Sequence, residues 1–152
     1  MLLNIRIIDT SIPWNKSSTK HQTIKELSNR INSFISKHYY GDSIETILIG
    51  LIVVEPIYDK FAKPRRPRYT EHKETIAFGS IPIVIHKTLE IEIKMDYEQI
   101  LAAEGEELRK IVAIEIINYL RILKLPKKVS DFEKDKFVSD VESYFKTEHL
   151  ID

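Results

Sequence analysis

The side chains best suited to acid–base or metal chemistry in this chain are its five histidines, since histidine titrates near neutral pH and is the commonest metal ligand. No two of them are four residues apart, the spacing that places two metal ligands on one helix face. The candidate pair is His72 with Glu74, because residues two apart on a strand point to the same side. This pair has the groups to hold a metal or move a proton, but a polar edge strand explains it without any chemistry.

Glu115 is the second candidate for chemistry. On a helix over Leu108–Leu123 it falls inside an arc of apolar residues. A carboxylate in such a place must find a partner, or its pKa rises as in many catalytic acids. The sequence locates no base or nucleophile to accompany it, so a structural role with burial and a hydrogen bond is the favoured interpretation. The residues of the arc are Leu108, Ile111, Val112, Tyr119 and Ile122.

The motifs of common cofactor and nucleophile sites are missing from the sequence. It contains no cysteine, which excludes thiol catalysis and cysteine-bound zinc or iron–sulfur clusters. Its four glycines form no phosphate loop, no dinucleotide fingerprint and no serine nucleophile elbow. Asp131, Glu133 and Asp135 alternate like calcium ligands, but acids at a helix N-terminus are explained by the helix dipole. We therefore predict no catalytic residue, no cofactor and no metal, and a protein that is not an enzyme.

The basic segment Lys63–Arg68 is a candidate nucleic-acid contact. Its four cations and two prolines could grip phosphates, and Tyr69 could stack on a base. Acidic and basic residues balance at 23 each over the whole chain, however, and nucleic-acid binders usually carry a basic excess. A solvated hairpin loop is the favoured interpretation of this segment, and nucleic acid is not the expected partner.

These candidates need a fold to position them, and the sequence predicts one α+β domain over residues 1–152. Alternation from Leu3 to Ile7 predicts a first strand. A capping box that starts at Thr19 then predicts a helix over Lys20–Tyr39. The β-branched run Ile44–Ile57, apolar on both alternations, predicts a central strand.

The second half of the chain predicts three strands followed by two helices. Consecutive strands without intervening helices indicate a mainly antiparallel sheet of about five strands, in the order β-α-β-β-β-β-α-α, with the helices packed on one face. The predicted elements are strands over Tyr69–Phe78, Ile81–His86 and Leu89–Met95, a helix over Tyr97–Leu123 with a weak point at Gly105, and a last helix opened by a capping box of Ser130 and Glu133.

The polar side of the strand Leu89–Met95 is the candidate partner-binding site. Strict alternation places Glu90, Glu92 and Lys94 together, away from the apolar side of the strand. Arg6 of the first strand is predicted to join them. If the helices cover the opposite face, this charged face is open for a partner, and charge complementarity can set the specificity of the contact.

The C-terminal half of the chain resembles a known class of proteins. The segment Leu89–Tyr97 leads directly from a strand into a helix, and a final helix opens at Val129–Phe132 and ends near Ser143–Phe145. This arrangement, mainly over residues 89–146, resembles bacterial immunity proteins that neutralise polymorphic or contact-dependent toxins. The resemblance implies a non-enzymatic inhibitor that occupies a cognate toxin domain, often a nuclease.

Two other functions stay open beside this one. A small enzyme would use Glu115 or the His72/Glu74 pair, and a nucleic-acid-binding regulatory domain would use Lys63–Arg68. The N-terminus lacks the pattern of a signal peptide, and the apolar run Ile47–Val54 is too short to span a membrane, so a cytoplasmic protein without membrane contact is expected. Its oligomeric state is not indicated by the sequence.

Overall fold

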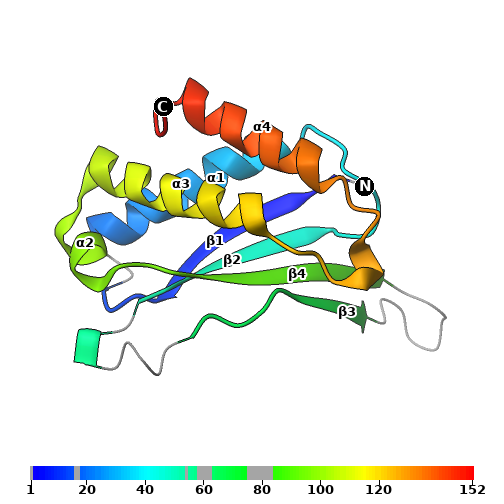
Figure 1. The fold of residues 1–152 in the computed structure, drawn as a ribbon, viewed down its shortest axis with the longest axis horizontal. Coiled ribbons are helices and arrows are strands. Elements are labelled where there is room, and N and C mark those ends of the chain that lie inside the picture. Colours follow the sequence, from blue (N-terminus) through cyan, green and yellow to red (C-terminus); the bar gives the residue numbers. More distant parts are fainter. Residues whose placement is uncertain (1, 16–17, 54, 58–62, 75–83) are drawn as a thin grey trace.

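The computed structural model describes residues 2–15, 18–53, 55–57, 63–74 and 84–152. Within this part of the chain, four strands form one sheet in the order β1-β2-β4-β3 (Figure 1). The strands are β1 Asn4–Ser11, β2 Thr46–Ile52, β3 Arg68–Glu74 and β4 Val84–Lys94.

The sheet is mixed, which corrects the prediction of a mainly antiparallel sheet of about five strands. β1 and β2 are parallel, as are β2 and β4, whereas β3 and β4 are antiparallel. A helix between β1 and β2 returns the chain to the same end of the sheet, so the two strands run in one direction. β2 and β3 follow one another in the sequence without pairing, because β4 lies between them.

The strand bounds explain the difference in strand count. The strands predicted over Ile81–His86 and Leu89–Met95 are a single long strand, β4, although residues 81–83 lie outside the described residues. The strand predicted over Tyr69–Phe78 corresponds to β3, and residues 75–78 also lie outside them. The long run Ile44–Ile57 contains β2, which ends well before Pro56.

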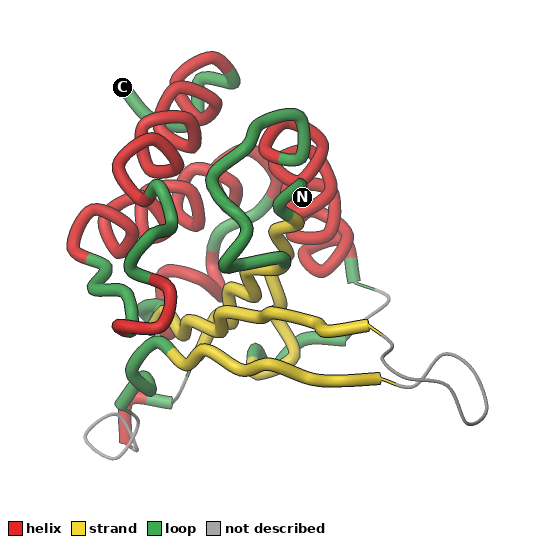
Figure 2. The backbone as a smooth tube through the Cα atoms, turned by 90° about the vertical axis from the view of Figure 1, so that its right-hand side faces the viewer, coloured by secondary structure: helices red, strands yellow, loops and turns green. Residues whose placement is uncertain are grey.

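The helices pack on one face of the sheet, as the sequence predicted (Figure 1). Figure 2, turned by 90°, shows the same layering, with the helices above the strands. The described helices are α1 Thr19–Ile35, α2 Tyr97–Ala102, α3 Gly105–Ile122 and α4 Lys134–Thr147, with a short 3-10 turn over Lys127–Val129.

Several helix ends differ from the sequence prediction. The N-cap of α1 is Ser18 rather than Thr19, since its side chain accepts a hydrogen bond from the His21 backbone N–H at 3.2 Å. The helix predicted over Tyr97–Leu123 is two helices, because the backbone is extended at Ala103 and Glu104, and Gly105, with a φ of 55°, then begins α3.

The remaining helix ends include a side-chain cap on α2 and a wrongly predicted cap on α4. Asp96 caps α2 by accepting from the backbone N–H of Gln99 at 2.8 Å. Ser130 ends the 3-10 turn instead of capping α4, and Glu133 precedes α4 without a side-chain cap bond. α1 ends at Ile35, four residues before the predicted Tyr39.

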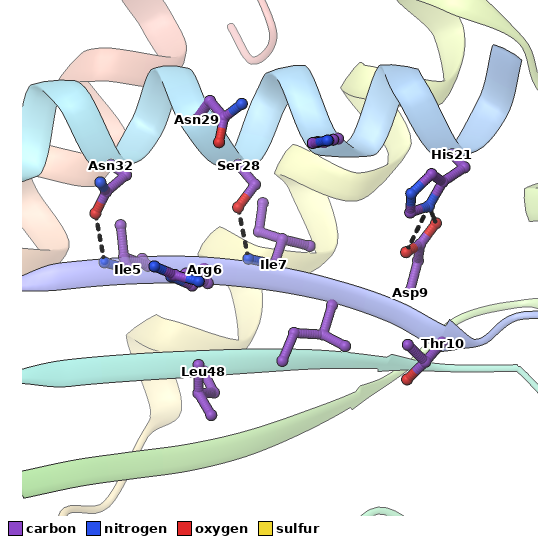
Figure 3. Close-up of a pocket in the computed structure, with 12 residues that line it drawn as sticks. Ile5, Arg6, Ile7, Asp9, Thr10, His21, Ser28, Asn29, Asn32 and Leu48 are labelled. Atoms are coloured by element: carbon purple, nitrogen blue, oxygen red, sulfur yellow. Dashed lines mark hydrogen bonds and ion pairs between the residues drawn. The ribbon is translucent and has the colours of Figure 1, made fainter. Parts of the chain in front are cut away.

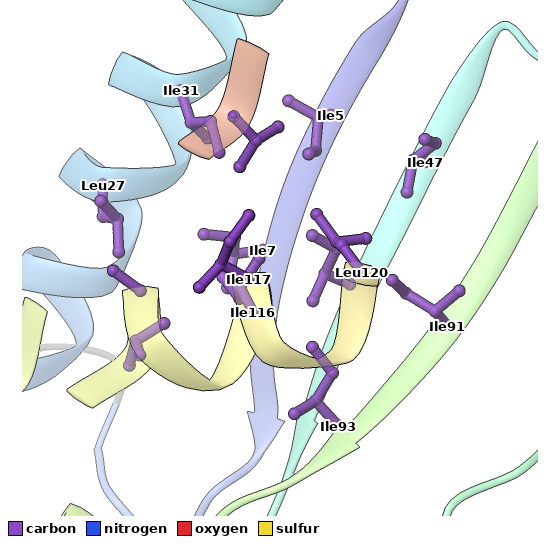
Figure 4. Close-up of a cluster of buried hydrophobic side chains, with 14 of the residues drawn as sticks. Ile5, Ile7, Leu27, Ile31, Ile47, Ile91, Ile93, Ile116, Ile117 and Leu120 are labelled. Atoms are coloured by element: carbon purple, nitrogen blue, oxygen red, sulfur yellow. The ribbon is translucent and has the colours of Figure 1, made fainter. Parts of the chain in front are cut away.

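The core lies between the helix layer and one face of the sheet (Figure 4). Alternate residues of β1, β2 and β4 meet the apolar stripes of α1 and α3, and burial of this apolar surface is the main force that holds the layers together. The side chains labelled in the figure are Ile5, Ile7, Leu27, Ile31, Ile47, Ile91, Ile93, Ile116, Ile117 and Leu120.

Candidate partner-binding surface

The sheet face opposite the helices, here called the open face, collects the residues that the sequence proposed for partner binding. Side chains alternate along a strand, so the neighbours of buried core residues point to this side. The strand register places Arg6 opposite Leu48 and Leu48 opposite Glu90, in one row across three strands. The described open face consists of Asn4, Arg6 and Ile8 of β1, Thr46, Leu48, Gly50 and Ile52 of β2, His86, Thr88, Glu90, Glu92 and Lys94 of β4, and Arg68, Thr70 and His72 of β3.

Both glutamates of the open face are engaged by arginines of the basic segment. Arg68 Nη2 lies 2.5 Å from Glu90 Oε2, on adjacent strands in direct register. The Arg65 backbone N–H donates to Glu92 Oε2 at 2.8 Å, and Arg65 Nε lies 3.7 Å from Glu92 Oε1. The basic segment and the acidic strand, which the sequence treated as separate candidates, therefore form one surface.

The middle of the open face is apolar. Ile8, Leu48 and Ile52 are each half-buried although no helix of the described chain covers them. Gly50 lies in register between Ile8 and Glu92. An apolar centre with a charged border is the usual anatomy of a protein–protein interface.

Arg6 is the exposed cation on the β1 side of this face. Among the described residues it has no ion-pair partner, in contrast to Arg65 and Arg68. Arg6, Ile8 and Leu48 also line a cleft of about 560 Å³ that continues around β1 to α1 (Figure 3).

The far side of that cleft holds a set of polar contacts that the sequence reasoning missed. Side chains of α1 bond the outer edge of β1: Asn32 Oδ1 accepts from the Ile5 N–H at 2.8 Å, and Ser28 Oγ accepts from the Ile7 N–H at 2.9 Å (Figure 3). The spacing could have revealed this, because four helical residues span about 6 Å and two strand residues about 6.7 Å. α1 thus protects an edge strand that would otherwise expose its N–H groups.

A buried carboxylate extends this row of contacts. Asp9, 6% exposed, accepts from Trp14 Nε1 at 2.7 Å, and its Oδ2 lies 2.8 Å from His21 Nδ1. An aspartate–histidine pair is also a component of catalytic sites, but Ser28 lies about two helical turns from His21 and is not placed as its nucleophile. The contacts fasten the end of β1 to α1.

A comparison with protein families identifies the chain. The model of a family described as immunity protein 44 matches residues 3–147. The chain belongs to the immunity protein 44 family. This confirms the resemblance to toxin immunity proteins, and the match extends it from the C-terminal half to nearly the whole sequence. Neither curated proteins nor solved structures gave a match to this immunity protein.

Glu115 of the immunity protein is not the buried acid that the sequence predicted. It is half-buried on the flank of α3, and in the described part of the chain it makes no hydrogen bond or ion pair. The predicted arc was centred wrongly, since Ile122 is 75% exposed. The buried stripe of α3 is instead formed by Leu108, Val112, Ala113, Ile116, Ile117 and Leu120.

The His72/Glu74 pair stays a prediction, because only one of its two side chains lies in the described part of the structure. His72 is exposed and its ring stacks on that of His86, with centroids 6.2 Å apart, while the Glu74 side chain lies outside the described residues. No three potential metal ligands gather anywhere in the described part of the immunity protein. Among its described helices, none is long and apolar enough to cross a membrane.

Proposed function

We propose that this immunity protein neutralises a cognate toxin domain by binding it through the open face, as a non-enzymatic inhibitor. Family membership supports a toxin as the partner. The observation that carries the choice of surface is the apolar centre of the face, which no described helix covers and which charged side chains border. The cysteine-free sequence fits a complex that forms in the reducing cytoplasm.

The proposed contact residues are Arg6, Glu90, Glu92 and Lys94. The register brings them together from β1 and β4, which are separated by β2 alone. Their side chains share the face with Leu48, so a partner that packs on the apolar centre also meets these charges. Charges at such a border steer association and reject partners of the wrong pattern.

The ion pairs of the open face argue against one special form of this proposal, in which Glu90 and Glu92 mimic the phosphates of a nucleic acid in a nuclease toxin. A phosphate mimic would offer free carboxylates to a basic nuclease site, whereas Glu90 and Glu92 are already held by Arg68 and Arg65. The same pairs reduce the charge that the basic segment can offer to nucleic acid. We therefore propose a toxin domain of any activity as the partner.

The test is calorimetry with the toxin domain encoded by the neighbouring gene, in an inactivated form. Reversal of both Glu90 and Glu92 to Lys should weaken binding by roughly 1–3 kcal/mol. The matched control reverses Glu107 and Glu148, two exposed acids on the helix layer, and should leave the affinity unchanged. Circular dichroism should show that both double variants are folded.

A charge swap separates partner binding from internal pairing. The variant with Glu90→Arg and Arg68→Glu keeps an internal ion pair and the net charge, but exchanges the positions of its two charges. It should bind the toxin more weakly than wild type. Wild-type affinity in both the reversal and the swap would remove this face from the interface.

A further inference from the structure

Gly50 occupies the middle of the open face and has no structural reason to be glycine. β2 is an interior strand, where glycine is destabilising because it loses more backbone entropy on folding than other residues and packs no side chain. An added Cβ at Gly50 would meet the Ile91 carbonyl oxygen at 3.7 Å and Glu92 Cγ at 4.0 Å, which are ordinary contacts. The protein's own packing therefore has room for a larger residue.

The other described glycines with special geometry show the contrast. Gly41 and Gly105 have φ of 108° and 55°, in the region that residues with side chains rarely adopt. Gly50 lies in a regular strand that pairs in register on both sides and is not among the positive-φ residues. Backbone strain does not account for the glycine, so its use must be sought outside the chain.

Because Gly50 has no side chain, it leaves a gap between its neighbours on the open face. The side chains around this gap indicate what would fill it. Leu48 and Ile52 flank it along β2, and Ile8 lies opposite on β1. These three side chains are half-buried and apolar, and the cleft beside β1 includes Ile8 and Leu48. An apolar side chain placed over Gly50 would be enclosed by them on three sides.

We propose that Gly50 receives an apolar side chain of the toxin domain, and that an adjacent carboxylate of the toxin pairs with Arg6. The inference rests on the proposed function and names the anchor of that interface. In many interfaces a few central residues that fill well-packed pockets contribute most of the binding energy. Arg6 is exposed one row from Gly50 and has no ion-pair partner among the described residues, so a carboxylate on the toxin is the complementary group.

The experiment fills the gap at position 50 with a side chain of the immunity protein itself. Gly50→Ala and Gly50→Val are titrated with the inactivated toxin domain of the neighbouring gene, and the unfolding midpoint in denaturant is measured for each. Affinity should fall by about 10-fold for Ala and about 100-fold for Val, because a larger side chain at position 50 leaves less room for the side chain of the toxin. The midpoint should stay equal to wild type or rise for Gly50→Ala, because the structure has space for the Cβ.

The matched control is Thr46→Val, on the same strand and the same face but four residues away. It should change affinity by less than about twofold, as a near-isosteric change away from the anchor does. Arg6→Ala should weaken binding in wild type and have a smaller effect in the Gly50→Val background, because the two contacts are made by the same partner segment.

The outcomes separate this inference from the proposed function. Wild-type affinity in a folded Gly50→Val, together with weakened binding in the Glu90 and Glu92 reversal, would overturn the anchor and keep the open face as the interface. Absence of toxin binding by wild type would overturn both. Self-association of wild type that is lost in Gly50→Val, with toxin binding unchanged, would assign the gap to a second copy and also overturn the proposal. If Gly50→Val fails to fold, Gly50→Ala and Gly50→Ser decide the question.

Discussion

The two faces of this sheet are built from neighbouring residues of the same strands but differ in burial. In β2, Ile47, Ile49 and Leu51 face the helices and are fully buried, whereas Leu48 and Ile52 face away and are only partly buried. The strand is apolar on both alternations, so hydrophobicity alone does not distinguish its sides. The distinction comes from what lies opposite: α1 and α3 on one side, and no helix of the described chain on the other.

This difference separates stability from recognition. Apolar area removed from water on the covered face is gained in the isolated protein, while the apolar centre of the open face gains it only when a partner binds. The open face can therefore change its residues to follow a partner with small effects on folding. The predictions below test this separation by substitutions on either side of it.

The largest effect is expected for Ile49→Ala compared with Leu48→Ala. Ile49 is 0% exposed, so its truncation leaves a cavity and should lower the free energy of unfolding by roughly 2–5 kcal/mol. Leu48 is only partly buried on the opposite face, and its truncation should cost less than about 1.5 kcal/mol. Denaturant unfolding of the two variants measures both values. Equal losses would mean that the open face is a second core.

The next effect concerns Asp9→Ala, at the end of β1. Asp9 accepts from Trp14 Nε1 and contacts His21 Nδ1, so its removal leaves two part-buried donors unpaired. The free energy of unfolding should fall by roughly 2–3 kcal/mol. Hydrogen exchange should also become faster at the N–H groups of β1 that Ser28 and Asn32 protect. Unchanged exchange there would show that the contacts at Asp9 act separately from the rest of the edge.

A smaller effect is expected for Tyr40→Phe, within the helix layer. Tyr40 donates to Asp140 Oδ2 at 2.6 Å and packs against Phe137. Loss of this bond should cost roughly 1–2 kcal/mol at neutral pH, because the acceptor carries charge.

The same residue predicts a pH dependence. Burial, reinforced by the bond to Asp140, raises the pKa of Tyr40 above its ordinary value. A group with a raised pKa in the folded state stabilises the protein fully below the pKa of the unfolded state, about 10, and loses that contribution as pH rises toward the folded value. Wild type should therefore lose stability above about pH 10, and Tyr40→Phe should show a shallower alkaline loss. An identical alkaline slope in both proteins would contradict this assignment.

The elements of the covered side were the easier part to predict from the sequence. Alternation in Leu3–Ile7 and Leu89–Met95 is a local signal with a period of two, and β1 and β4 contain these segments except for the end residues Leu3 and Met95. The direction of the strands was predicted wrongly because it depends on which strands become neighbours. The insertion of β4 between β2 and β3 is a property of the whole chain and leaves no local pattern.

The open face shows where sequence reasoning ends. Alternation placed Glu90, Glu92 and Lys94 on one side of a strand, but their pairing with the basic segment joins residues 22 and 27 positions apart. Only the register of β3 on β4 brings Arg68 opposite Glu90. The predicted burial of Glu115 was wrong for a related reason. Its position on a helical wheel was right, but the packing of α3 determines which part of the wheel is buried.

The smallest effect on folding is expected for Arg68→Ala, the counterpart of Tyr40→Phe on the open face. Both variants remove one contact to a carboxylate, but the Arg68–Glu90 pair is more than one third exposed on each side. Water and salt screen such a pair, so its loss should lower the free energy of unfolding by less than about 1 kcal/mol, and less at high salt. Toxin binding should respond more than folding does, because Arg68 holds Glu90 in place at the border of the proposed interface. A loss of stability above 2 kcal/mol, of the size expected at a buried charged hydrogen bond, would show that this ion pair belongs to the folding of the sheet and would break the separation between the two faces.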